Sequence, residues 1–195
     1  MGKGRLEAFS DGVIAVIITV MVLELKVPLG GDLKDLTPLW PVFLTYILSF
    51  VNVGIYWNNH HHMLQAVRTI DGKALWANLH LLFWLSVVPL ATAWMGEHPL
   101  AKAPTALYGG VLLMNAIAYT ILAYLLVRHE GPDSTLARAF GRDYKDKVSV
   151  ACYVIAILAS PFAPVVSVAL YVVVAGIWFL PDRRIERAMN IGEAA

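Results

Sequence analysis

Six long apolar stretches, separated by short polar segments, dominate the hydrophobic pattern of this chain. They cover residues 8–27, 38–60, 74–95, 105–127, 147–162 and 164–181 in approximate bounds. Runs of about 20 predominantly apolar residues are typical of helices that cross a bilayer. The pattern therefore predicts an all-α integral membrane protein, with residues 1–195 forming a single domain of six transmembrane helices that lies in a lipid bilayer.

Proline and glycine mark most ends of these stretches, as expected where helices begin or stop. Pro28 with Gly30 and Gly31 follows the first stretch, and Pro104 precedes the fourth. The fifth and sixth form one hydrophobic run that is broken by the segment 161–164, which contains two prolines. We interpret this break as the turn of a tight helical hairpin.

The distribution of lysine and arginine predicts the orientation. With six spans and a cytoplasmic N-terminus, only three basic residues fall in outer loops, namely Lys26, Lys34 and Lys102. The inner segments hold twelve: Lys3, Arg5, Arg68, Lys73, Arg128, Arg138, Arg142, Lys145, Lys147, Arg183, Arg184 and Arg187. This excess matches the positive-inside rule and places both termini in the cytoplasm. The inner segment that follows the fourth stretch also suggests an amphipathic surface helix near 136–140.

Composition narrows the function classes. Hydrophobic residues make up 58% of the chain and charged residues 15%, well below the roughly 25% of soluble domains. The formal net charge is only +1, so charge gives no reason to expect a nucleic-acid partner. The single cysteine, Cys152, lies in an apolar run and is expected to be an inert thiol. No GxSxG motif occurs, and we expect no enzymatic activity.

Polar and charged residues lie at the entry to the first span, just before its apolar part. Arg5 and Asp11 lie there about 120° apart on a helix, too far for a direct pair. Ser10 and Asp11 therefore need partners on other helices. The topology brings the end of span two and the start of span three to the same depth, where donors occur at Trp57, Asn58, Asn59, His60, His61, His62, Asn78 and His80. We expect a hydrogen-bonded network among these groups.

The run of histidines at 60–62 also raises the possibility of a metal site. Consecutive imidazoles point to different faces of a helix, and no HExxH pattern is present. Structural histidines in a hydrogen-bonded network are the favoured interpretation, and we expect neither a bound metal nor a cofactor.

The rest of the first span carries a narrow stripe of small and β-branched residues. Val16, Thr19 and Leu23 fall within about 40° of Gly12 on a helical wheel, with Val20 at the edge. Such a stripe suits either a pore lumen or close packing against a neighbouring helix. Periodicity leaves both open, with packing favoured.

The segment Arg5-x-x-x-Phe9-Ser10-Asp11 closely resembles the RxxxFSD signature of the transmembrane-protein-175 potassium channel family. The cluster that closes span two and Asn78 in span three are similar to that family as well. The resemblance implies a bacterial six-span subunit that forms a homotetramer, with the first helix of each subunit lining a central pore. It also implies a potassium ion as the permeant species.

The resemblance further implies that different residues of the first helix form the constriction and the selectivity layer of the pore. Counted from Asp11, the family's hydrophobic constriction falls on Val16, where isoleucine or leucine is usual, and its threonine layer falls on Thr19. Val20 and Leu23 would line the pore further out. A neck of apolar side chains can gate by dewetting, and hydroxyl oxygens can favour the more easily dehydrated potassium ion.

These observations lead to one main hypothesis and three others. The main one is a potassium-selective leak channel in the bacterial plasma membrane. A secondary transporter or a proton-permeable cation pathway is the first alternative, although a transporter needs a charged or discontinuous-helix site near the midplane. A membrane metalloenzyme that uses the histidines, and a scaffold protein, are the remaining two.

Overall fold

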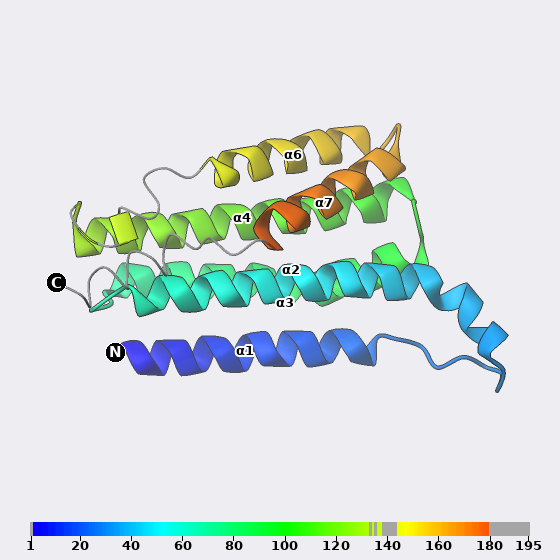
Figure 1. Ribbon diagram of the computed structural model, residues 1–195, viewed down its shortest axis with the longest axis horizontal. Coiled ribbons are helices and arrows are strands. Elements are labelled where there is room, and N and C mark those ends of the chain that lie inside the picture. Colours follow the sequence, from blue (N-terminus) through cyan, green and yellow to red (C-terminus); the bar gives the residue numbers. More distant parts are fainter. Residues whose placement is uncertain (1, 133, 135, 138–143, 180–195) are drawn as a thin grey trace.

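The computed structural model describes residues 2–132, 134, 136–137 and 144–179. Its helices lie side by side along the long axis of the molecule (Figure 1). Their bounds are Lys3–Leu23 for α1, Leu33–Leu39 for the 3₁₀ helix η1, Trp40–Gln65 for α2, Gly72–Glu97 for α3, Lys102–Glu130 for α4, Lys145–Ala159 for α6 and Pro164–Phe179 for α7. The architecture is all-helical, as the hydrophobic pattern predicts.

Four helical segments are long and apolar enough to cross a membrane among the residues described: Lys3–Leu23, Leu33–Gln65, Gly72–Glu97 and Lys102–Glu130. The other two helices, α6 and α7, have 15 and 16 residues. The six apolar stretches of the sequence thus correspond to the six helices α1, α2, α3, α4, α6 and α7 among the described residues.

Local sequence explains where the helices begin and turn. Asp71 caps α3, since its carboxylate accepts a hydrogen bond from the backbone N–H of Ala74 at 2.8 Å. The hairpin expected at 161–164 is confirmed, because α6 ends at Ala159 and α7 begins at Pro164. The Ser167 hydroxyl donates to the carbonyl of Ala156 at 2.6 Å and fastens the two helices together.

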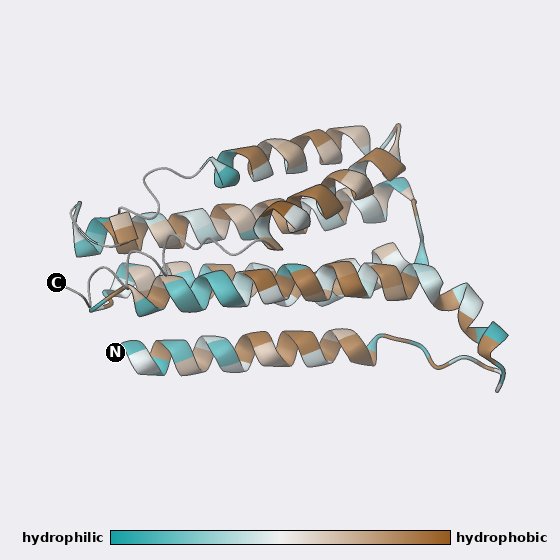
Figure 2. Ribbon diagram, in the orientation of Figure 1, coloured by the Kyte–Doolittle hydropathy of each residue, from teal (hydrophilic) through white to brown (hydrophobic). Residues whose placement is uncertain are grey.

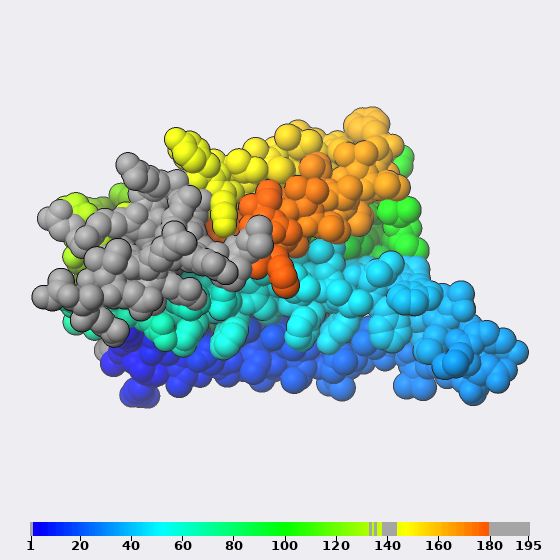
Figure 3. Space-filling model, viewed as in Figure 1, coloured from blue at the N-terminus to red at the C-terminus, as the bar shows by residue number. Residues whose placement is uncertain are grey.

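The third helix lies at the centre of the bundle and packs against α1, α2 and α4. Its inward side chains Leu81 and Leu85 are fully buried. Hydrogen bonds in a buried polar cluster also connect these helices. Ser49 of α2 lies 2.9 Å from the Tyr108 hydroxyl of α4 and accepts from Thr92 of α3 at 2.7 Å. By contrast, α1 packs mainly on α2 and α3 and forms one edge of the molecule (Figures 1 and 3).

Hydrophilic residues gather at the end where α1 begins, α2 ends and α3 begins (Figure 2). The predicted topology brings these helix ends together. Of the described inner basic residues, Lys3 and Arg5 lie at the start of α1, Arg68 follows the end of α2 and Lys73 lies at the start of α3. Several sequence predictions fall partly or wholly outside the described residues. These are the amphipathic helix near 136–140, of which only Leu136 and Ala137 are described, and the basic residues Arg138, Arg142, Arg183, Arg184 and Arg187.

Candidate functional site

The first helix has one face that is buried in the subunit and one that is exposed. One face is buried against α2 and α3 and carries Leu6, Ser10, Ile14, Ile17 and Met21. This face carries four large apolar side chains together with one hydroxyl. It therefore combines apolar packing with a single polar attachment point, Ser10.

The opposite face is exposed and contains the stripe identified in the sequence. Gly12 and Thr19 are exposed, the side chain of Val16 is 59% exposed, and that of Leu23 is 79% exposed. Val20 lies at the edge of the stripe and is 37% exposed. Packing of this stripe against a helix of the same subunit, one of the two interpretations that periodicity left open, does not occur within the described residues.

The Thr19 hydroxyl has a defined orientation. Its Oγ1 donates a hydrogen bond to the carbonyl oxygen of Val16, one turn earlier, at 2.9 Å. Because the hydroxyl proton is used by the helix itself, the oxygen lone pairs remain available to the exposed side. The geometry presents Thr19 as an acceptor, which is the polarity that a cation requires.

On the buried face, Asn78 of α3 joins α1 to α2. Its Nδ2 donates to Ser10 Oγ at 2.9 Å, and its Oδ1 lies 2.7 Å from His60 Nε2. An amide oxygen only accepts, so Nε2 of His60 carries the proton in this bond. All three side chains are almost completely buried. The three helices are thus connected by a chain of two hydrogen bonds in the interior.

Asp11 is held separately, at the margin of the same region. The indole Nε1 of Trp57 donates to Asp11 Oδ1 at 2.9 Å. His61 stacks on the Trp57 ring, with centroids 5.9 Å apart, and its Nε2 lies 2.8 Å from the side-chain nitrogen of Gln65. Lys3 then donates to the backbone carbonyl of Gln65 at 3.2 Å. The start of α1 is therefore attached to the end of α2 at two levels.

Arg5 and Phe9, the other two residues of the RxxxFSD segment, do not join this network. Both are exposed, Phe9 by 48%, and the side chain of Arg5 forms no hydrogen bond or ion pair among the described residues. Arg5 precedes Gly12 by seven residues, which places it on the exposed face of the helix. The motif is thus divided between the interior and the surface of the subunit.

Four other polar residues considered in the sequence lie elsewhere. Asn58 is half-buried, while Asn59 faces the opposite side of α2, where its backbone carbonyl accepts from Tyr119 at 3.5 Å. His62 packs edge-on against His61, and His80 accepts from the Trp84 indole on its own helix at 3.0 Å. Adjacent residues of a helix point about 100° apart, so Asn59 points away from the side of α2 on which His60 contacts Asn78.

The outer end of α1 has a different kind of attachment. Beyond the helix, Lys26 forms an ion pair at 2.5 Å with Glu97 at the end of α3. The Glu97 carboxylate raises the pKa of the Lys26 ammonium through this hydrogen bond and its charge. Both side chains are largely solvent-exposed, so the interaction is weak compared with the buried chain at the inner end.

Comparison with known proteins agrees with this arrangement. The model of the family described as endosomal/lysosomal potassium channel TMEM175 matches residues 5–89. A protein of Chryseobacterium sp. (strain P1-3) named potassium channel HX13_20290 is 54% identical over 97% of this chain and 99% of its own length. Human TMEM175, named an endosomal/lysosomal proton channel, is 36% identical over 47% of this chain and 20% of its own length.

A solved structure is similar along nearly the whole fold. It is the crystal structure of a lysosomal potassium-selective channel TMEM175 homolog from Chamaesiphon minutus, with a TM-score of 0.80 and 32% identity. The match covers 92% of this chain and 97% of the other. The matched family segment, residues 5–89, contains α1, its exposed stripe and the buried chain that attaches it. Sequence, fold and similarity together show that this multi-pass membrane protein belongs to the TMEM175 family.

Proposed function

We propose that this protein is a potassium channel in which four copies of the chain surround a central pore lined by α1. The observation that carries the proposal is the exposed stripe of Val16, Thr19 and Leu23, which the subunit leaves uncovered on its edge helix. Its chemistry, apolar with one outward acceptor, suits a cation path and offers no catalytic group. The family and fold are those of an ion channel, not of an enzyme.

A single subunit contributes only one side of such a path. Symmetric oligomers repeat the same surface around an axis, so four copies of α1 would enclose a lumen that one copy cannot. The stripe would then face a water-filled pathway, with the buried face of each α1 held by its own α2 and α3. The relatives that match most of the chain are bacterial, in keeping with a place in the bacterial plasma membrane.

The residues of the stripe would act in sequence along the pore. A ring of four Val16 side chains forms an apolar neck that an ion passes only by dragging or shedding its hydration water. Four Thr19 oxygens, each with its proton already bonded to the Val16 carbonyl, replace part of that water. Val20 and Leu23 line the wider outer section.

Proton permeation is the second candidate, and it is favoured by the name of the human relative, a proton channel. A secondary transporter is less favoured. Transporters bind their substrates at broken helices or charged groups near the midplane, whereas α1 is continuous from Lys3 to Leu23 and has only Thr19 as a polar residue beyond Asp11.

Flux into liposomes tests these candidates. Purified protein in potassium-loaded vesicles is expected to release potassium down its gradient without a coupling ion, and an internal pH dye reports proton entry in the same vesicles. Potassium release that requires a proton or sodium gradient contradicts the channel. Proton entry without potassium release shows instead a proton pathway.

The threonine layer has a matched control within the chain. Thr19→Val removes the acceptor at constant shape and is expected to reduce the preference for potassium over sodium by about tenfold, the effect of about 1.4 kcal/mol. Thr120 of α4 is also exposed and bonds its own helix in the same way, donating to Ala116 at 2.9 Å. Thr120→Val should leave the preference unchanged. An unaltered preference in Thr19→Val would remove Thr19 from the selectivity mechanism.

A further inference from the structure

The connection between α1 and α2 projects beyond the outer end of the helical bundle. It comprises residues 24–39, which we call the outer segment, and includes the short helix η1. The outer segment extends past the other helices along their long axis, on the same edge of the molecule as α1 (Figures 1 and 3). No residue of η1 is buried, and its main helical neighbour is α2. The rest of the subunit therefore leaves the outer segment largely uncovered.

Three leucines form one apolar stripe along η1. A 3₁₀ helix has three residues per turn, so the side chains of Leu33, Leu36 and Leu39 lie above one another. Leu39, next to α2, is half-buried, whereas Leu36 is 38% and Leu33 is 87% exposed. Val27, in the loop before η1, is also exposed, and it is the next exposed large apolar residue after Leu23. The exposed stripe of α1 is thus followed along the chain by the exposed apolar residues of the outer segment.

The outer segment has a defined local structure although little of the subunit covers it. A capping box closes the start of η1: the Asp35 carboxylate accepts from the backbone N–H of Asp32 at 3.0 Å, and the Asp32 side chain accepts from the backbone of Asp35. A side chain at Gly30 would collide with the Asp35 carboxylate. Pro38 and Pro41 restrict the backbone where η1 joins α2. A surface that is ordered in advance loses little conformational entropy on binding, which suits the leucine stripe to a protein contact.

Charge and position disfavour a lipid surface as the partner. Helices that lie on membranes are rich in lysine and arginine on their polar face. The start of η1 instead has one lysine, Lys34, between Asp32 and Asp35, and this lysine pairs with Asp32 at 2.9 Å. The outer segment also extends along the direction of the helices, which cross the bilayer, and so leads out of the hydrocarbon layer (Figure 1). The observations therefore favour a protein surface.

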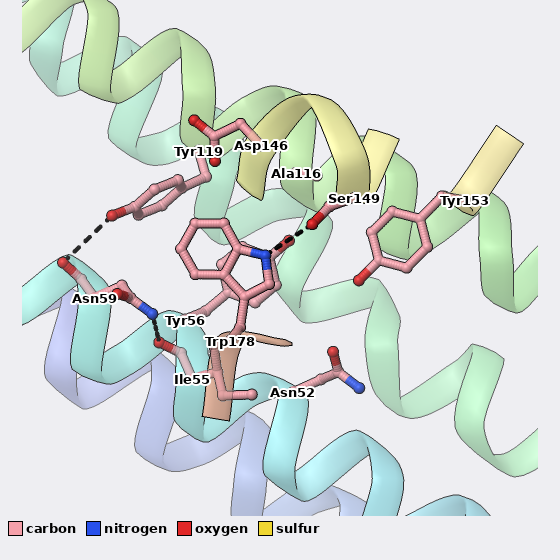
Figure 4. Close-up of a pocket in the computed structure, with 10 residues that line it drawn as sticks. All are labelled: Asn52, Ile55, Tyr56, Asn59, Ala116, Tyr119, Asp146, Ser149, Tyr153 and Trp178. Carbon is pink, nitrogen blue, oxygen red and sulfur yellow. Dashed lines mark hydrogen bonds between the residues drawn. The ribbon is translucent and has the colours of Figure 1, made fainter. Parts of the chain in front are cut away.

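The opposite side of the subunit finds its partners within one copy. There, α2 meets α4, α6 and α7 around a small pocket (Figure 4). The Trp178 indole donates to Ser149 at 2.8 Å, and the Tyr119 hydroxyl donates to the Asn59 carbonyl at 3.5 Å. The lining residues from α2, α6 and α7 are Asn52, Ile55, Tyr56, Asn59, Asp146, Ser149, Tyr153 and Trp178. The leucine stripe of η1 has no comparable cover among the described residues.

We propose that the outer segment of each copy packs against that of the adjacent copy, so that four copies form a collar around the outer mouth of the pore. This inference rests on the proposed tetramer, in which α1 faces the central axis. Because the outer segment follows α1 on the same edge, four-fold symmetry brings four outer segments together there. Leu33 and Leu36 of one copy are then covered by the next copy. The collar holds the assembly together at the end where each α1 has only apolar packing and the exposed Lys26–Glu97 pair.

Spin labels test what covers the outer segment. In a Cys152→Ser background, Leu33→Cys carries the label into the collar. Phe162→Cys is the matched control, because Phe162 is 89% exposed at the turn between α6 and α7, away from α1. In liposomes, the label at Leu33→Cys should be shielded both from oxygen, which concentrates in lipid, and from a nickel chelate, which stays in water. The control label should be reached by at least one of them. Free access of either reagent to the label at Leu33→Cys overturns the collar.

Distances between the labels separate this proposal from that of the tetramer. Pulsed dipolar spectroscopy should give shorter distances between copies for Leu33→Cys than for Phe162→Cys. Longer distances for Leu33→Cys overturn the collar alone. Absence of coupling at both positions means that the chain does not assemble and overturns both proposals. A failure of potassium flux in wild-type protein with the expected distances concerns only the channel proposal.

The stability of the assembly provides a second measurement. Leu33→Lys places a charge in the collar, where burial without a partner is costly. The protein concentration at which the tetramer dissociates in detergent, followed by light scattering, should rise about tenfold, the effect of about 1.4 kcal/mol. Phe162→Lys should leave it unchanged, and circular dichroism checks that both variants keep their helices. Dissociation of Leu33→Lys at the wild-type concentration overturns the collar.

Discussion

The two faces of α1 differ in what they contact and not in how apolar they are. Ile14 and Ile17 on one face are buried in the subunit, whereas Val16 and Leu23 on the other are exposed. A hydropathy scale treats the two faces alike. The difference lies in Ser10, whose hydroxyl accepts from Asn78 and fixes the rotation of the helix about its axis. The buried face thus has a polar anchor in the interior that the exposed stripe lacks.

The largest expected effect comes from breaking the buried attachment. Asn78→Leu leaves Ser10 and His60 without their partner, and each unpaired group costs about 1–3 kcal/mol. We expect a loss of about 2–4 kcal/mol in the free energy of unfolding, measured by denaturation in detergent micelles. Asn58→Leu is the control, since Asn58 is half-buried and makes no hydrogen bond among the described residues. Equal losses in both variants would contradict the special role of Asn78.

A pair of threonine substitutions compares the faces directly. Ile14→Thr places a hydroxyl in a buried apolar site and should destabilise the protein by about 1–3 kcal/mol. Val16→Thr changes an exposed position at constant shape and should stay within about 0.5 kcal/mol of wild type. In the proposed channel it should instead increase potassium flux, because a hydroxyl wets the neck. Unfolding and liposome flux are measured on both, and a reversed pattern would mean that the faces are assigned wrongly.

The smallest effect is expected at the outer end of α1. Lys26→Met removes the exposed pair with Glu97 and should lower the melting temperature slightly, by an amount that salt abolishes. Because the pair raises the pKa of Lys26 above its usual 10.5, its contribution is complete below that value and is lost as pH rises through the raised pKa. Melting of wild type and variant should therefore converge in strong alkali.

Lys34→Met is the matched control for that measurement. Lys34 of η1 pairs with Asp32, the residue before that helix, at 2.9 Å and forms no other ion pair among the described residues. Its removal should leave the melting temperature of the protein unchanged at every pH. A drop equal to that of Lys26→Met would show that the loop charge matters, and not the connection between α1 and α3.

The sequence was most informative where polar groups are rare. The depth of Ser10 and Asp11 in the predicted topology led to Trp57, His60 and Asn78 as partners, and the structure brings these groups together because an apolar span offers few other partners. The wheel placed Val16, Thr19 and Leu23 on one stripe. It left the environment of that stripe open, since the same residues suit a lumen and a helix contact.

The residues of α6 and α7 that face the rest of the bundle were harder to predict. Asn52, Tyr56 and Asn59 share one face of α2 by their spacing of four and three residues, and this signal was available in the sequence. Their partners Ser149, Tyr153 and Trp178 come from α6 and α7, where nothing in the hydrophobic run indicated which residues turn inward. Rotation of each helix is set by packing against its neighbours, and single-span periodicity carries no information about those neighbours.

Because α1 is attached unevenly along its length, it is expected to tilt about its buried end. Its buried hydrogen bonds lie near Ser10, while its outer end has only apolar packing and the exposed Lys26–Glu97 pair. Thr19 lies nine residues beyond Ser10, about 13 Å along the axis, so a tilt of about 5° about this pivot moves it by about 1 Å. Small shifts of α2 or α3 beside Ser10 are thereby magnified at Thr19, where, in the proposed pore, a displacement of that size would change the distance between an oxygen and an ion.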